Sequence, residues 1–173
     1  MTAAVYSDRT PLVVAACLLA LVLRPLGYAG TAVTLAVGVA GAAVPVNAGG
    51  ARRRVWTMVT LVGMAAFALV GFGGHALPAR TTAIGIAASA AAGVAEELFF
   101  RRLLYSRLER FGPAAAVAGA AALFALVHVP AYGTAALPVD VAAGLVLGWQ
   151  RWATGSWTAP AATHVFANLI QVV

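Results

Sequence analysis

Acidic charge is scarce in this sequence, and lysine is absent. Of 173 residues only 9% are charged, with five acidic residues against eleven basic ones, all of them arginine. Soluble domains average about 25% charged residues, so the composition excludes an ordinary soluble domain. With 62% hydrophobic residues and a mean hydropathy of +0.93, the chain falls in the integral-membrane class.

Cysteine is almost absent too. Cys17 is the only cysteine, so an intrachain disulfide is excluded, and its place in an apolar run favours a thiol that faces lipid or a neighbouring helix. Internal repeats and low-complexity linkers are also missing, so we expect one integral-membrane domain over residues 1–173. The missing internal symmetry argues against a transporter built from two similar halves.

Long apolar runs are what the sequence has instead. They lie near residues 11–24, 28–46, 55–72, 81–105, 113–130, 137–150 and 156–173. About twenty apolar residues cross a bilayer as a helix. The sequence therefore predicts an all-α fold, a polytopic transmembrane helical bundle of about seven helices, with six to eight as the range. The first run also has the length of a signal-peptide core, but further spans follow at once and we expect it to be retained.

The arginines lie mostly in the connections between these runs, and their distribution predicts an orientation. Cytoplasmic connections carry an excess of basic residues. One side has only Arg24 and Arg80, whereas the other has Arg9, Arg52, Arg53, Arg54, Arg107, Arg110 and Arg151. We therefore expect a cytoplasmic N-terminus in a bacterial plasma membrane. The net charge of +6 is then a topology signal, so we expect membrane lipid as a partner and no nucleic acid.

Two adjacent acids, Glu96 and Glu97, interrupt one apolar run. Acidic side chains at membrane depth are costly and indicate a functional site by default. Glu97 and Arg101 are spaced i,i+4, so they can form a structural ion pair on one helix face. Glu96 lies about 100° round the helix from Glu97 and has no local partner. Another part of the fold must therefore satisfy Glu96 or use it.

Two other apolar runs each carry a further cluster. Phe124 and His128 lie in the run 113–130, and His164 and Asn168 lie in the run 156–173. Glu96 and His128 are each sixteen residues from the turn at Gly112. At about 1.5 Å per residue this spacing puts them at the same depth. Counted from Gly155, Asn168 comes near that level as well. We therefore expect the polar residues of three helices to converge.

The converging groups are a carboxylate, two imidazoles and a carboxamide in apolar surroundings. Peptide hydrolysis requires a base that deprotonates water and donors that meet the oxyanion on the scissile carbonyl. These groups can supply both. A single buried histidine would be interpreted as a hydrogen-bonded core residue, but two of the three histidines share the level of the paired acids Glu96 and Glu97.

The three clusters resemble the motifs of the CAAX protease and bacteriocin-processing family of intramembrane endopeptidases, which includes the type II CAAX prenyl endopeptidases. E-E-L-F-F-R at 96–101 is similar to the family's E-E-x-x-x-R, F-A-L-V-H at 124–128 to its F-x-x-x-H, and H-V-F-A-N at 164–168 to its H-x-x-x-N. All three motifs lie within 93–168 and in the family's order.

The resemblance implies four catalytic residues and three supporting ones. The catalytic residues are Glu96, His128, His164 and Asn168. The supporting residues are Glu97, Arg101 and Phe124. Glu96 would be the general base on a water that His128 orients, while His164 and Asn168 would stabilise the oxyanion. Glu97 would brace the site through its ion pair.

The resemblance leaves the role of metal open. One carboxylate and two imidazoles are also a zinc set, and it would consist of Glu96, His128 and His164. The sequence does not decide between zinc and a metal-free glutamate mechanism, because Asn168 suits an oxyanion donor as well as an outer-shell group. We favour the mechanism without a cofactor.

The leading interpretation is an intramembrane endopeptidase that hydrolyses a peptide bond of a membrane-associated or lipidated peptide. The alternative is a non-catalytic membrane protein of the same family with an immunity or scaffold role. A polar-lined channel or a proton-coupled transporter is a third interpretation. Outside the motifs, we interpret His75 as a solvated loop residue and Asp140 as an interfacial one.

Overall fold

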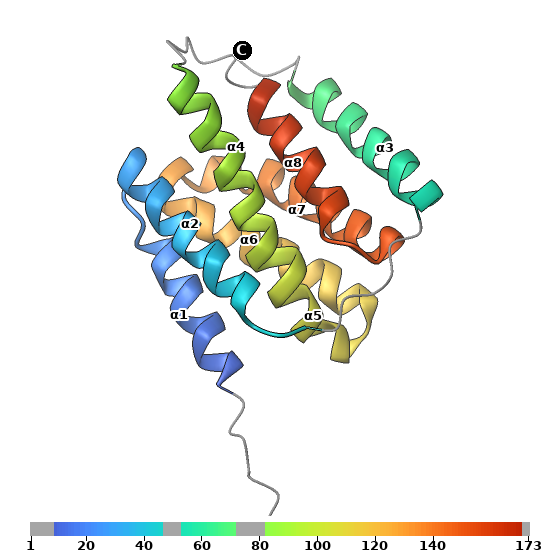
Figure 1. Cartoon of the computed structure of the whole chain (residues 1–173), viewed down its shortest axis with the longest axis horizontal. Coiled ribbons are helices and arrows are strands. Elements are labelled where there is room, and N and C mark those ends of the chain that lie inside the picture. The colour runs from blue at the N-terminus through green and yellow to red at the C-terminus, as the bar shows by residue number, and fades with distance from the viewer. Residues whose placement is uncertain (1–8, 47–52, 72–81, 171–173) are drawn as a thin grey trace, which may run out of the picture.

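The computed structural model describes residues 9–46, 53–71 and 82–170, and every regular element in these ranges is a helix (Figure 1). In chain order the elements are α1 (Thr10–Val22), α2 (Tyr28–Ala43), α3 (Arg53–Gly71), α4 (Ala83–Glu97), η1 (Leu98–Leu104), α5 (Tyr105–Leu108), η2 (Glu109–Phe111), α6 (Pro113–Tyr132), η3 (Thr134–Ala136), α7 (Leu137–Thr154) and α8 (Thr158–Ile170). The predicted all-α class is confirmed.

The elements from α4 to η2 follow one another directly and form one long helix, Ala83–Phe111. In the same way η3 leads directly into α7. Counted so, the described ranges contain seven helices, the number that the apolar runs predict. The long helix continues past the predicted end at residue 105, because the apolar run ends there but the helical backbone does not.

Two helices of the described ranges, Ala83–Phe111 and Pro113–Tyr132, are long and apolar enough to cross a membrane by length and composition. Three shorter apolar helices are Thr10–Val22, Tyr28–Ala43 and Val55–Leu69. A 13-residue helix such as α1 rises only about 20 Å, less than the ~30 Å hydrocarbon core of a bilayer. A complete polytopic bundle therefore stays a prediction.

The long helix with the two acids runs through the middle of the molecule, with α2 on one side and α8 on the other (Figure 1). Two glycines of α2 allow this close approach. A Cβ at Gly38 would lie 2.5 Å from the Cβ of Ala95, and a Cβ at Gly41 would lie 2.8 Å from the carbonyl oxygen of Leu98. Helix α2 therefore packs directly against the turn that carries Glu96.

Directly after the two acids the helix widens into the π-helical segment η1. Single π-helical turns inside α-helices occur frequently at functional sites. Two arginines connect this segment to its neighbours, one from α7 and one from η1 itself. Nε of Arg151 on α7 donates to the carbonyl of Arg101 at 3.1 Å, and Nη1 of Arg102 donates to the carbonyl of Gly41 at 2.5 Å. These bonds tie η1 to α7 and to α2.

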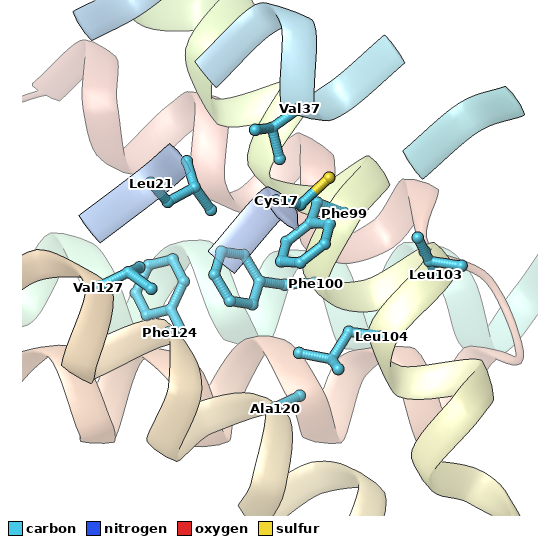
Figure 2. Close-up of a cluster of buried hydrophobic side chains, with 10 residues drawn as sticks. All are labelled: Cys17, Leu21, Val37, Phe99, Phe100, Leu103, Leu104, Ala120, Phe124 and Val127. Carbon is cyan, nitrogen blue, oxygen red and sulfur yellow. The ribbon is translucent and has the colours of Figure 1, made fainter. Parts of the chain in front are cut away.

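A buried apolar cluster lies around η1, and its side chains come from α1, α2, η1 and α6 (Figure 2). Its ten members are Cys17, Leu21, Val37, Phe99, Phe100, Leu103, Leu104, Ala120, Phe124 and Val127. The rings of Phe100 and Phe124 meet edge to face at 5.3 Å. Cys17 is 7% exposed. Its thiol therefore faces neighbouring helices and not lipid, one of the two surroundings that the sequence predicts.

Helix α6, which carries His128, is fixed against α7 by another glycine. A Cβ at Gly144 would lie 2.8 Å from Cα of Ala121, so the two backbones touch. Close contact through small residues is the usual packing where lipid supplies no hydrophobic drive between helices. It sets the position of α6 relative to the rest of the site.

Candidate active site

Glu96 and Glu97 are the last two residues of α4, and both are buried, at 7% and 0% exposure. Adjacent helical residues point about 100° apart. The two carboxylates therefore face different neighbours, and each forms its own set of contacts.

Glu97 forms the ion pair that its spacing predicts. Its Oε1 accepts a hydrogen bond from Nη1 of Arg101 at 2.8 Å. The Nη2 group of Arg101 donates to the carbonyl of Gly144 at 3.3 Å. Both side chains of the pair are fully buried, so removing either one would leave an uncompensated charge away from water. The predicted Glu97–Arg101 pair is confirmed.

The same oxygen of Glu97 also holds His164 on α8. Nδ1 of His164 lies 2.8 Å from Oε1 of Glu97. An ionised carboxylate only accepts hydrogen bonds, so Nδ1 carries the proton and donates it. The other ring nitrogen, Nε2, then faces Glu96 at 3.7 Å from Oε2. Glu97 therefore orients His164 as well as binding Arg101.

His128 on α6 is oriented by its own helix. Its Nδ1 lies 2.7 Å from the carbonyl oxygen of Phe124, and because a carbonyl only accepts, Nδ1 is again the donor. Nε2 of His128 lies 3.8 Å from Oε2 of Glu96. The convergence of Glu96 and His128 that their equal depth predicts is confirmed.

Two imidazole nitrogens thus face one carboxylate oxygen, Oε2 of Glu96. The separations of 3.7 and 3.8 Å are longer than a direct hydrogen bond and fall within the span of one bridging water. The three groups come from α4, α6 and α8. All three side chains are buried.

The ring of Phe124 forms one wall of this site. Its centroid lies 4.5 Å from the ring of His128 and 5.8 Å from that of His164. The guanidinium carbon of Arg101 lies 4.7 Å from the same centroid, a cation–π distance. Phe124 therefore supports both histidines and the Glu97–Arg101 pair, while its own carbonyl orients His128.

Arg24 is the site residue that the sequence reasoning missed. Arg24 lies in the connection between α1 and α2, as the arginine distribution predicts, but its side chain is only 10% exposed and its Nη1 donates to Oε1 of Glu96 at 3.1 Å. No role at the site was predicted for Arg24 from the sequence. The missing local partner of Glu96 was the signal that some distant cation was needed.

The three motif clusters lie in a part of the chain that a family model matches. Residues 78–170 match the model described as type II CAAX prenyl endopeptidase Rce1-like, which is more than half of the chain. The chain belongs to this family. No curated protein and no solved structure matches the sequence. Together with the apolar helices, membership identifies a membrane protein from a family of membrane-embedded proteases.

Asn168, the fourth motif residue of this CAAX-family chain, is engaged on α4. Its Nδ2 donates to the carbonyl of Ser89 at 3.0 Å and approaches Gly93, where a Cβ would lie 3.1 Å away. Ser89 precedes Glu96 by seven residues, about 10 Å along the helix. The described structure gives Asn168 no hydrogen bond to Glu96 or His128. Its catalytic role stays a prediction.

Two polar residues outside the motifs, His75 and Asp140, were also interpreted from the sequence. His75 lies outside the described residues. Asp140 is in the first turn of α7 and is partly exposed. Its Oδ2 atom is buried and has no hydrogen-bond partner within the described ranges. The interfacial role expected for Asp140 stays a prediction.

The site does not fit a metal ion well. Among the described residues, no group of three or more His, Cys, Asp or Glu side chains is arranged to hold a metal. The guanidinium of Arg24 also lies against Glu96, where a divalent cation bound to this carboxylate would meet a second positive charge. We therefore derive no chemical step through zinc at Glu96, His128 and His164.

Proposed function

We propose that the protein is an intramembrane endopeptidase that hydrolyses a membrane-associated or lipidated peptide with water activated by Glu96. The observation that carries the proposal is the position of Oε2 of Glu96, which faces Nε2 of both His128 and His164. One oxygen of a buried carboxylate is thereby left for a water that two imidazoles can also contact. A base within reach of its water is the first requirement of general base catalysis.

In the proposed reaction Glu96 takes a proton from this water as the oxygen attacks the scissile carbonyl carbon. The carbonyl π electrons move to the oxygen and form a tetrahedral oxyanion. The protonated Glu96 then gives the proton to the leaving nitrogen as the C–N bond breaks. The oxyanion electrons re-form the C=O bond as the C–N bond breaks, and the products are a carboxylic acid and an amine. The acid then gives its proton to the amine or to solvent, and Glu96 is again in its starting form.

The oxyanion needs hydrogen-bond donors that are already in place. His164 supports this role when both ring nitrogens are protonated, because Nδ1 donates to Glu97 and Nε2 is then free to donate to the oxyanion. Asn168 has two N–H groups on Nδ2, and the bond to Ser89 uses one of them. The second N–H of Asn168 supports a donor role as well.

Two comparisons of activity test the proposal. Purified protein in liposomes is given an internally quenched peptide with a prenylated cysteine near its C-terminus, and the same peptide without the lipid. We expect cleavage of the lipidated peptide, and at least about a hundredfold loss of activity in Glu96→Gln, the range of general base catalysis. Folded protein that cleaves neither peptide would support the non-catalytic immunity or scaffold role instead.

The site's place in the membrane is part of the same proposal. We propose a polytopic protein of a bacterial plasma membrane, and the arginine distribution supports an N-terminus in the cytoplasm. Single cysteines introduced into a Cys17→Ala background at Arg9 and Arg110 should react with a membrane-impermeant maleimide only after the membrane is opened. Labelling of both from outside intact cells would reverse the orientation.

A further inference from the structure

The connection between α1 and α2 brings a cation to the catalytic carboxylate. Arg24 lies one residue before Pro25, in the turn that separates Val22 from Tyr28. A Cβ at Gly30 would overlap the carbonyl oxygen of Pro25, so the start of α2 folds back tightly onto this turn. Gly27 has a φ of 75°, a left-handed conformation that glycine adopts without steric cost. The turn therefore holds Arg24 in a defined place.

One nitrogen of Arg24 makes two hydrogen bonds. Nη1 donates to Oε1 of Glu96 at 3.1 Å and to Oγ1 of Thr34 at 3.3 Å. Thr34 is 3% exposed, and its own hydroxyl donates to the carbonyl of Gly30 at 3.1 Å. The guanidinium is thus held between α2 and α4, because the bond to Thr34 keeps it in place beside Glu96.

We propose that Arg24 is a positioning residue of the active site, which holds Oε1 of Glu96 so that Oε2 faces the two histidines. This inference rests on the proposed function. The terminal torsion of a glutamate is broad and roughly two-fold, so an unheld carboxylate would present either oxygen at varying angles. With Oε1 bound to Arg24, Oε2 stays 3.7 Å from Nε2 of His164 and 3.8 Å from Nε2 of His128.

Arg24 also keeps the charges of the site balanced. Glu96 and Glu97 are adjacent buried acids, and each has its own guanidinium, Arg24 for the first and Arg101 for the second. Without Arg24, the buried carboxylate of Glu96 would lose its guanidinium partner, and a buried charge without its partner is strongly destabilising.

Arg24 lies outside the residues that match the family model, which begin at 78. The matched segment carries all three motif clusters, but the cation bound to Glu96 comes from the N-terminal pair of helices. The pair α1 and α2 is accordingly part of the catalytic apparatus and not only a packing partner. No motif in the sequence marks Arg24, because its contact with Glu96 spans 72 residues.

Substitutions at Arg24 test the proposal in the full-length protein with the quenched lipidated peptide. Arg24→Gln should lower kcat by about 10- to 100-fold with little change in KM, the loss expected when a reacting group is misplaced by about 1 Å. Arg24→Lys keeps a positive charge and should recover part of kcat. Thr34→Val, which removes the second contact of Nη1, should lower kcat by a smaller factor and carries the test if Arg24→Gln does not fold.

Arg102→Gln is the matched control, because Arg102 is also a partly buried arginine that bonds to α2 and does not touch the site. It should lower the melting temperature in detergent without changing the kcat of the folded protein. In a Glu96→Gln background, Arg24→Gln should cause no further loss of kcat, since the base is already absent. The double variant Arg24→Gln/Glu96→Gln should also have a higher melting temperature than the sum of the two single losses predicts.

An unchanged kcat in folded Arg24→Gln, or no rescue by Arg24→Lys, would overturn the proposal while leaving the proposed function in place. An equal loss of kcat in Arg102→Gln would also overturn the proposal, because the loss in Arg24→Gln could then be explained by lower stability alone. Wild-type protein without any activity would overturn the proposed function, and the positioning role with it. In that case the melting temperatures still report whether the Arg24–Glu96 pair forms.

Discussion

Oε2 of Glu96 lies 3.8 Å from Nε2 of His128, although the two residues belong to different helices. The long helix and α6 form a hairpin about Gly112, and both residues are sixteen positions from this turn. Equal spacing along two antiparallel helices places them side by side. The hairpin therefore places the proposed base beside His128, a proximity that the residue counts alone predict.

Glu96→Gln should remove activity and leave the fold in place. Glutamine keeps the shape of the side chain and can still accept from Arg24, but it cannot take a proton from water. We expect kcat to fall by at least about a hundredfold, measured with the quenched peptide. Gel filtration and circular dichroism in detergent should match the wild-type protein. Full activity in the variant would show that Glu96 is structural.

Glu97→Ala should act on stability before it acts on chemistry. It leaves Arg101 as a fully buried charge without its carboxylate and frees Nδ1 of His164. Breaking a buried ion pair costs about 3–5 kcal/mol of unfolding free energy, to be measured by chemical unfolding in mixed micelles. Glu109→Ala is the control, since Glu109 is exposed on the same long helix and should change stability by less than about 0.5 kcal/mol. Equal stability of the two variants would contradict the importance of the buried pair.

Asn168→Ala tests whether Asn168 donates to the oxyanion or only links α8 to α4. Loss of an oxyanion donor costs about 2.7–4 kcal/mol of transition-state stabilisation, a fall in kcat of about 100- to 1000-fold. Loss of the bond to Ser89 alone costs about 0.5–1.5 kcal/mol of stability and leaves kcat nearly unchanged. We expect the large loss of kcat. Ser89→Ala keeps the main-chain carbonyl and serves as the control for the α4–α8 contact.

Chelation should leave the activity unchanged. Glu96 itself is the base in the proposed mechanism, and its other oxygen is bound to a guanidinium. Elemental analysis of the purified protein should find no stoichiometric zinc, and prolonged treatment with a strong chelator should not lower kcat. One zinc per chain, lost together with activity and restored with it on adding zinc back, would establish a metal mechanism with Glu96, His128 and His164 as ligands.

Several features of the site were predictable because they depend on spacing along one helix or across one hairpin. The i,i+4 separation of Glu97 and Arg101 predicts their ion pair, and the structure contains it at 2.8 Å. The equal distance of Glu96 and His128 from Gly112 predicts their contact. Helical geometry fixes both relationships without knowledge of the remaining fold.

The partners that come from separate parts of the chain were not predictable in this way. Arg24 reaches Glu96 across 72 positions, and nothing in its local sequence distinguishes it from an arginine in an exposed connection. The depth of Asn168 placed it near Glu96, yet its amide donates to Ser89. His164 is the residue of α8 that lies level with the two glutamates, and Asn168 lies four residues, about 6 Å, further along the helix. A residue count from Gly155 does not specify how far α8 is shifted along its axis relative to α4.

The sequence by itself determined that this chain is helical and apolar, that Glu96 and Glu97 lie inside one helix, and that Glu96 and His128 share a level. These properties follow from composition, from the period of the helix and from the lengths between turns. Only the tertiary structure decided which oxygen of Glu96 binds a guanidinium and which one faces the two histidines. That choice depends on where the α1–α2 turn places the guanidinium of Arg24, and long-range packing of α2 against the long helix, through Gly38 and Gly41, fixes that place.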